Sequence, residues 1–205
     1  MGAGFVITIY TSDQALSAAD VTALPRSSVD RGWGGEPLGT PFSWCFALEP
    51  QRLWFLCEVA GGARYSPERA AGEFVEGLWE EDVGEFFVRD PSGRYQEFNL
   101  APSGAWWSAV FDSYRCRAEV SPRPTVVEVH TQVSSGSWRG LLGIARESMT
   151  IQVTEGSSLH VSGITYASMC CYLSSYPDRS VDPDFHRSEC FQGVSFVPAR
   201  VANPG

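Results

Sequence analysis

The chain has 205 residues, of which 43% are hydrophobic and 13% aromatic, and its formal net charge is −9. A chain of this length can bury a complete core, and we expect one domain that spans residues 1–205. Its 24 acidic residues outnumber 15 Lys and Arg, which argues against a surface that follows nucleic-acid phosphates.

Targeting signals and cysteine motifs are both missing from the sequence. The first 20 residues lack the basic start and long apolar run of a secretory signal, and no segment approaches the roughly 18 apolar residues that span a bilayer. We therefore predict a cytoplasmic location and no contact with a membrane. The six cysteines form no C-x-x-C pair, so we expect free thiols and no zinc site.

The first half of the chain reads as strands and irregular loops. Phe5–Tyr10 is the first predicted strand, and 18–31 is irregular or briefly helical. Trp44–Leu48 and Leu53–Val59 form a predicted hairpin around residues 49–52. A loop with a short helix at Pro67–Phe74 follows.

The clearest hairpin signal lies at residues 83–100. Two runs rich in aromatic and β-branched residues flank Asp90-Pro91-Ser92-Gly93, a sequence typical of a type I turn with a glycine bulge. This turn pairs Glu85 with Asn99, Phe87 with Glu97 and Arg89 with Tyr95. Phe86, Val88, Phe98 and Leu100 then point to the opposite, apolar face.

Further strands are predicted up to residue 172. They are Trp106–Phe111, Thr125–Val133, Trp138–Ile144, Met149–Val153 and Leu159–Tyr172. Trp106 and Trp107 must point to opposite faces, so that one is in the core and the other is free to line a groove. Strand after strand with short turns predicts an all-β fold, an antiparallel β-sandwich with short helical loop segments.

The polar face of the central hairpin is the candidate binding surface. Trp79 stands just before a strand pair that carries Glu85, Arg89, Glu97 and Asn99. A flat aromatic ring beside carboxylates and amides can hold a sugar, because the ring stacks on its apolar face and the polar groups bond its hydroxyls. A solvated sheet surface, with Trp79 closing the core, is the alternative.

Two segments resemble a known family. The run from Trp79 to Val88, followed by Tyr95-Gln96-Glu97-Phe98-Asn99 and 102–106, is similar to the pattern of carbohydrate-binding module family 9 and its DOMON-like relatives. Asp184-Phe185-His186, with Cys190-Phe191 after it, resembles the ending of the single-domain DOMON-like branch.

The resemblance implies a β-sandwich without catalytic machinery. In sugar-binding members the motif tryptophan stacks on the ligand and the glutamate six residues later bonds its hydroxyls, which by position are Trp79 and Glu85. Tyr172 stands nearest to the position of the second aromatic wall, and Trp138 is the other candidate for it. Phe185, His186 and Phe191 are assigned mainly to structure.

We therefore predict a non-enzymatic module that binds a carbohydrate or similar polyol without a cofactor, and leave any protein partner open. Two alternatives remain, a scaffold that has lost the sugar site and a haem or redox-ligand domain. For haem the candidate ligands are Met149 and Met169 with His130 or His160. Asp182, Asp184 and His186 could bind calcium, although a hydrogen-bonded turn is the stronger interpretation.

Overall fold

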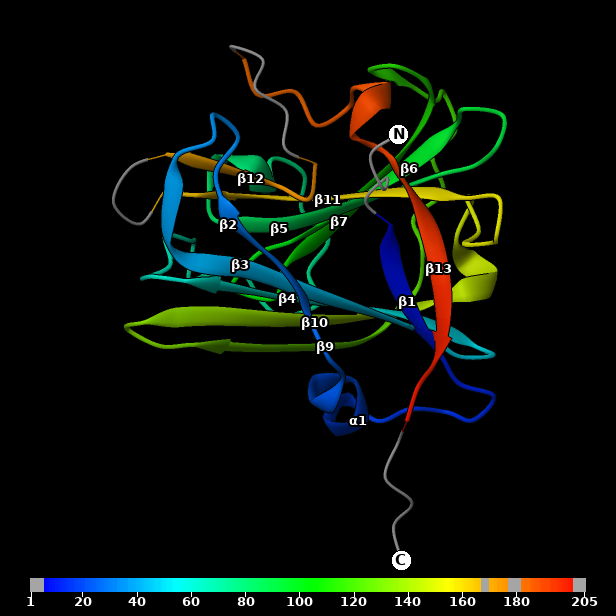
Figure 1. Ribbon diagram of the computed structural model, residues 1–205, viewed down its shortest axis with the longest axis horizontal. Coiled ribbons are helices and arrows are strands. Elements are labelled where there is room, and N and C mark those ends of the chain that lie inside the picture. Colours follow the sequence, from blue (N-terminus) through cyan, green and yellow to red (C-terminus); the bar gives the residue numbers. More distant parts are fainter. Residues whose placement is uncertain (1–5, 167–169, 177–181, 201–205) are drawn as a thin grey trace, which may run out of the picture.

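The computed structural model describes residues 6–166, 170–176 and 182–200, and its regular secondary structure is mainly strand, with one short helix (Figure 1). The strands are β1 (Ile7–Thr11), β2 (Ser27–Arg31), β3 (Pro37–Leu48), β4 (Arg52–Ala60), β5 (Val83–Arg89), β6 (Tyr95–Leu100), β7 (Trp106–Ser113), β8 (Cys116–Arg117), β9 (Val126–Val133), β10 (Ser137–Ala145), β11 (Ser158–Thr165), β12 (Cys171–Ser174) and β13 (Gln192–Pro198). The helices are α1 (Ala18–Ala23) and the 3-10 turns η1 (Leu78–Glu80), η2 (Arg146–Ser148) and η3 (Ser188–Cys190). Within the described residues, no helix is long and apolar enough to cross a membrane.

The strands form two facing layers that β13 joins. One layer runs in the order β8-β7-β6-β5-β11, with β12 on β11, and the other runs β1-β3-β4-β10-β9, with β2 on β3. β13 pairs with both β11 and β1, so it connects the two layers at one side of the molecule (Figure 1). The all-β sandwich predicted from the sequence is thereby confirmed.

The sheet is mixed, whereas the sequence analysis predicted a purely antiparallel sandwich. β1 pairs in parallel with β13 on one side and with β3 on the other. The alternation of apolar and polar residues along a strand fixes its faces but not the direction of its neighbours. Strand direction at β1 depends on the long-range path of the chain.

The main core lies between the two layers. From the β5–β6 side it receives Phe86 and Phe98, whose rings stack with centroids 4.7 Å apart. From the opposite layer it receives Phe46 and Phe55, and the rings of Phe55 and Phe86 also lie 4.7 Å apart. Contact between rings from both layers holds the sandwich closed.

The register predicted for the central hairpin is confirmed. Glu85 pairs with Asn99, Phe87 with Glu97 and Arg89 with Tyr95. The amide of Asp90 donates to the carbonyl of Arg94, and Gly93 has the left-handed φ of 94° that the bulge requires. The turn and the alternation are local signals, which is why the sequence alone predicts them.

Three predicted segments differ from the structure. Residues 67–74 form turns rather than a helix, and Gly72 there has a positive φ of 81° that no helix residue adopts. Met149–Val153 is not a strand, because the amides of Thr150 and Ile151 both donate to the side-chain oxygen of Gln96 instead of to a ladder. β2, which is polar and lies at an edge, was not predicted as a strand.

Gly84 lies where the two layers come close together beneath the hairpin, and this contact can be tested by mutation. A methyl group added there would lie 2.5 Å from the Cys57 sulfur, whereas one added at Gly193 would meet nothing within 4 Å. We expect Gly84→Ala to lower the free energy of unfolding by about 1–3 kcal/mol, and Gly193→Ala to change it far less. Denaturant unfolding measures both.

The sulfur of Cys57 is the near atom, so Cys57→Ala in the Gly84→Ala background should recover part of that loss. If Gly84→Ala and Gly193→Ala lowered the free energy of unfolding by the same amount, the close approach at Gly84 would not be a constraint on the fold.

Candidate functional site

A pocket lies over the outer face of the β5–β6 hairpin, on the side away from the core. Its volume is about 470 Å³, within the range of small-molecule sites. We call it the tryptophan pocket. Its lining residues are Glu76, Trp79, Glu85, Phe87, Glu97, Trp107, Phe111, Arg115, Arg117, Ile164, Tyr172, Pro183, Phe185 and His186.

Two buried carboxyl groups form part of the floor of this pocket. Glu85 is 2% exposed and Glu97 is 5% exposed. The hydroxyl of Ser162 donates to Glu85 over 3.0 Å, and the side-chain amide of Asn99 donates to Glu97 over 3.1 Å. Few protein donors thus reach these two acceptors, so most of their hydrogen-bonding capacity faces the pocket.

Burial changes the acidity of both floor carboxyls. Desolvation, together with the nearby charge of Glu97, raises the pKa of Glu85 to about 8. Desolvation also raises the pKa of Glu97 to about 7, although Asn99 and two arginines act in the opposite direction. The floor therefore holds protons at neutral pH that ordinary carboxylates have lost.

Two tryptophans form a corner of the pocket. Trp79, on η1, is 38% exposed, and Trp107, on β7, is buried beside it. Their ring centroids lie 5.6 Å apart with the planes at 73°, an edge-to-face contact. The hydroxyl of Tyr166 donates to the backbone carbonyl of Trp79 over 2.9 Å. These contacts fix Trp79 and leave part of its ring accessible.

The facing wall comes from residues 183–186 and is tied to the turn between β7 and β8. Arg115 in that turn pairs with Asp184 over 2.9 Å, and Tyr114 donates to the same carboxylate over 2.5 Å. Arg115 has φ of 52°, which is costly for a residue with a side chain. The hydroxyl of Tyr95 bonds His186 Nδ1 over 2.9 Å and accepts the Arg115 amide over 3.1 Å. This network holds the wall and the turn together.

The structure gathers four of the predicted site residues at the pocket and one beneath it. Trp79, Glu85, Glu97 and Tyr172 all line it. Asn99 is fully buried under the floor and acts on the pocket through Glu97. Their part in binding stays a prediction.

Two of the predicted site residues lie elsewhere. Trp138 is 0% exposed and packs in the main core, because β10 turns its even-numbered residues toward the facing layer. Arg89 shares a face with Glu85 but stands at the far end of β5, where it bonds Ser158 and lies 4.3 Å over the ring of Phe191. Neither residue lines the tryptophan pocket.

Several lining residues were not predicted as site residues. Of Trp106 and Trp107, one was expected in the core and the other free to line a groove, without a choice between them. The structure places Trp106 in the main core and Trp107 at the pocket. Phe185 and His186 were assigned to structure, yet they also line the wall. Arg115 and Arg117 follow a turn whose place beside the hairpin depends on the pairing of β6 with β7, and no local motif indicates it.

Among the described residues, the candidate haem ligands do not come together at one site. Both nitrogens of His160 already have partners, the carbonyl of Phe185 at 3.0 Å and the hydroxyl of Ser174 at 2.8 Å. His130 pairs with Glu128 over 2.6 Å on the surface, and Met149 is buried in the core. Met169 lies outside the described residues.

The segment considered as a calcium site forms a hydrogen-bonded turn at Asp184. Asp184 accepts from the amide of His186 over 3.1 Å and pairs with Arg115, so the interpretation of this segment as a turn network is confirmed for Asp184. Among the residues that the structure describes, no group of three or more His, Cys, Asp or Glu could hold a metal ion.

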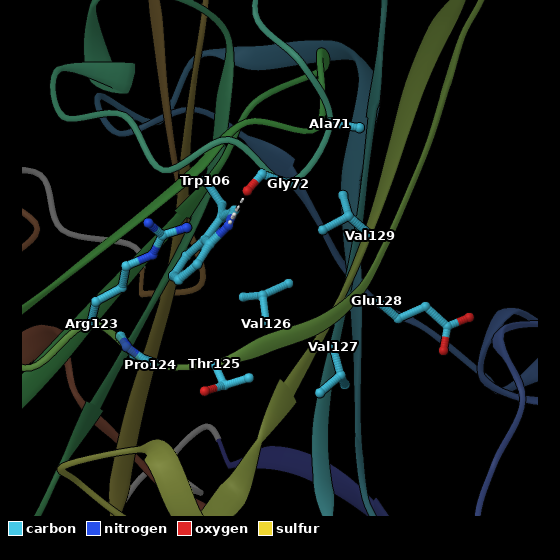
Figure 2. Close-up of a pocket in the computed structure, with 10 residues that line it drawn as sticks. All are labelled: Ala71, Gly72, Trp106, Arg123, Pro124, Thr125, Val126, Val127, Glu128 and Val129. Carbon is cyan, nitrogen blue, oxygen red and sulfur yellow. Dashed lines mark hydrogen bonds between the residues drawn. The ribbon is translucent and has the colours of Figure 1, made fainter.

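A second pocket, of about 500 Å³, lies between residues 71–72, Trp106 and β9 (Figure 2). Figure 2 shows the ring nitrogen of Trp106 donating to the carbonyl of Gly72, a bond of 3.1 Å. Trp106 is only 1% exposed, and the guanidinium of Arg123 lies 5.4 Å from its ring centre. This ring presents no free face, so the second pocket lacks the stacking platform that Trp79 gives the first.

Comparison with known proteins identifies the fold. No family model and no curated protein sequence matches the chain. A candidate carbohydrate-binding protein from Bacteroides uniformis ATCC 8492 aligns over 95% of this chain and 100% of its own, with a TM-score of 0.71 and 16% identity. A carbohydrate-binding module of family 9 from Caldicellulosiruptor kristjanssonii in complex with glucose aligns over 98% and 100%, with a TM-score of 0.62 and 10% identity.

A structure of a family 9 module from the same organism in complex with cellotriose aligns over 98% of this chain and 96% of its own, with a TM-score of 0.56 and 10% identity. The chain therefore has a fold like that of family 9 modules, as the sequence resemblance implies. The DOMON-like part of the resemblance stays a prediction.

The raised pKa values of the floor carboxyls predict how stability depends on pH. A carboxyl whose pKa is higher in the folded state favours folding while it is protonated, and this contribution is lost as pH rises from about 4.5 toward 8. Between pH 6.5 and 8.5 we expect Tm to fall by roughly 5 °C, and Glu85→Gln to remove much of that fall. Thermal unfolding followed by circular dichroism measures it.

Titration of His160 and His186 cannot cause this fall. Burial lowers their pKa values to about 3 and about 4, below the ordinary 6.5, and a lowered histidine pKa makes stability rise with pH, not fall. Glu80→Gln, a change in an exposed residue outside the pocket, is the control and should keep the wild-type slope. If Tm fell equally with pH in the wild type and in Glu85→Gln, Glu85 would not be the source of the pH dependence.

Proposed function

We propose that this chain is a non-catalytic binding module for a carbohydrate or a similar polyol, held in the tryptophan pocket. The observation that carries the proposal is the accessible ring of Trp79 beside a buried floor of hydrogen-bond acceptors, Glu85 and Glu97. Sugars combine an apolar ring face with a rim of hydroxyl groups. A site that offers an aromatic face and buried acceptors together is complementary to both parts.

The rim of the pocket adds hydrogen-bond donors to the acceptors of the floor. Arg115 and Arg117 line it, and Arg117 also lies 5.2 Å over the ring of Trp107. Tyr172 contributes an aromatic side chain to the wall, with its ring centre 6.2 Å from that of Phe185. A polyol in this pocket would meet acceptors below, donors at the rim and aromatic surfaces at the sides.

The fold neighbours support the same class of ligand. The family 9 modules were solved with glucose and with cellotriose. At 10% identity they share the fold with this chain, and function has to be argued from the site. The geometry of Trp79, Glu85 and Glu97 supplies that argument, since it joins a ring to carboxyls within one pocket.

The proposal is tested by titrating the protein with mono- and oligosaccharides, using tryptophan fluorescence and calorimetry. We expect saturable binding of at least one sugar and a change in fluorescence, because Trp79 and Trp107 lie at the pocket. No heat and no fluorescence change across the panel would contradict the proposal and favour a scaffold without a ligand site.

Trp79→Ala separates binding from folding. The Trp79 side chain is 38% exposed, so its loss should leave Tm nearly unchanged while it weakens sugar binding at least tenfold, which is about 1.4 kcal/mol or more. Calorimetry of the variant measures the affinity, and circular dichroism confirms the fold.

Arg89→Ala is the matched control, because Arg89 is on the same hairpin face as Glu85 but outside the tryptophan pocket. It should keep the wild-type affinity. If Arg89→Ala abolished binding and Trp79→Ala did not, the site would lie in the smaller pocket between Arg89, His186 and Phe191.

A further inference from the structure

The charged groups of the tryptophan pocket are not balanced. Arg117 pairs with Glu76 over 2.7 Å, and Arg115 pairs with Asp184 over 2.9 Å. Each guanidinium at the rim therefore has its own carboxylate. Glu85 and Glu97 remain, and within the described residues no arginine or lysine nitrogen lies within 4 Å of either.

His186 does not supply the missing positive charge. Its Nε2 lies 3.8 Å from a carboxyl oxygen of Glu97, beyond hydrogen-bond distance. Burial lowers the pKa of His186 to about 4, so the imidazole is neutral at pH 7. The floor of the pocket thus has two acidic groups and no fixed cation in contact with them.

The floor also has more acceptors than donors. The side-chain amide of Asn99 donates to Glu97, and the side-chain oxygen of Asn99 is fully buried and has no hydrogen-bond partner among the described residues. Glu85 receives one bond, from Ser162. Buried acceptors without partners are costly, and a ligand group with several N–H donors would satisfy the acceptors that open to the pocket.

The aromatic side chains around this floor suit the same kind of group. Trp79, Trp107, Tyr172 and Phe185 all line the pocket, and the faces of such rings attract cations. Arg117 already lies over Trp107. The ring of Trp79, by contrast, has no cation over it in the part of the chain that the structure describes.

We infer that the pocket selects an amino sugar, that is, a polyol ring with a protonated amine that lies between the Trp79 ring and the carboxyls of Glu85 and Glu97. This inference rests on the proposed function and narrows its ligand class. A neutral sugar can use the hydroxyl contacts but leaves the acidic floor uncompensated. An acidic sugar brings a negative charge beside two carboxyls that no fixed cation contacts, so the expected order of affinity is amino, neutral, acidic.

The test compares sugars that share one ring and differ in one substituent. Calorimetry at pH 6.5 with methyl glycosides of glucosamine, glucose, N-acetylglucosamine and glucuronic acid gives four affinities for the wild-type protein. We expect the glucosamine derivative to bind at least tenfold more tightly than the glucose and N-acetyl derivatives. The glucuronic acid derivative should bind more weakly than glucose.

Proton release gives a readout that affinity alone does not. The floor carboxyls are largely protonated at this pH, and an ammonium group beside them favours the ionised form. The carboxyl O–H bond then breaks and its proton passes to the buffer, while the amine keeps its own proton. Calorimetry in two buffers of different ionisation enthalpy should detect proton release with the amino sugar and none with glucose.

Variants separate the charge effect from a loss of folding. Glu85→Gln and Glu97→Gln should each reduce the preference for glucosamine over glucose from tenfold or more to less than threefold. Arg89→Gln, outside the pocket, should keep both the affinities and their ratio. Circular dichroism confirms that each variant is folded.

The outcomes distinguish this inference from the proposed function. Equal or weaker binding of glucosamine than of glucose overturns the inference and leaves carbohydrate binding in place. Binding of none of the four sugars contradicts both. Tetramethylammonium and cyclohexylamine serve as cations without a sugar ring. If either binds as tightly as glucosamine, the pocket recognises a cation alone and the amino-sugar inference is overturned.

Discussion

The register of the β5–β6 hairpin is the constraint on which both the core and the pocket depend. Because side chains alternate along a strand, the pairing that places Phe86 against Phe98 in the core also places Glu85 and Glu97 on the outer face. A slip by one residue in this pairing would move one strand's aromatic residues to the outer face and its carboxyl group to the core. Selection of the apolar core therefore fixes the position of the carboxyls at the same time.

The carboxyls are buried by segments that come from other parts of the chain. η1 brings Trp79, and the wall at 183–186 covers the opposite side. This wall is held by the pair between Asp184 and Arg115, a turn residue with a positive φ. Ion pairs thus hold the rim in place, while the acidic groups of the floor have no arginine partner in the part of the chain that the structure describes. Charges fixed in this way are organised before a ligand arrives.

Local sequence signals predicted the hairpin. Which other residues reach the pocket depends on long-range packing, which the sequence does not show. Turn residues and alternation were sufficient to place Glu85. Tyr172 was indicated by the family resemblance, through its position shortly before the Asp184-Phe185-His186 segment. Trp138 lies in the core and not at the pocket, because an alternating strand has two faces and only its partner layer decides which is buried. Arg89 lies at a different pocket, since residues on one strand face need not share one pocket. Arg115 reaches the site through the pairing of distant strands and its contact with the 183–186 wall.

Two tryptophans from different elements, Trp79 and Trp107, form a corner of the pocket, whereas the sequence indicated Tyr172 or Trp138 as the second aromatic wall. At 73° the edge of one ring supports the other, so Trp107 restricts the rotation of Trp79 while it leaves ring surface accessible. The bond from Tyr166 to the Trp79 carbonyl restrains the backbone at the same position. A side chain as exposed as that of Trp79 ordinarily loses rotational freedom when a ligand binds to it, and this loss of entropy weakens affinity. Here the fold has already imposed that order, so contacts to Trp79 can contribute more fully to binding.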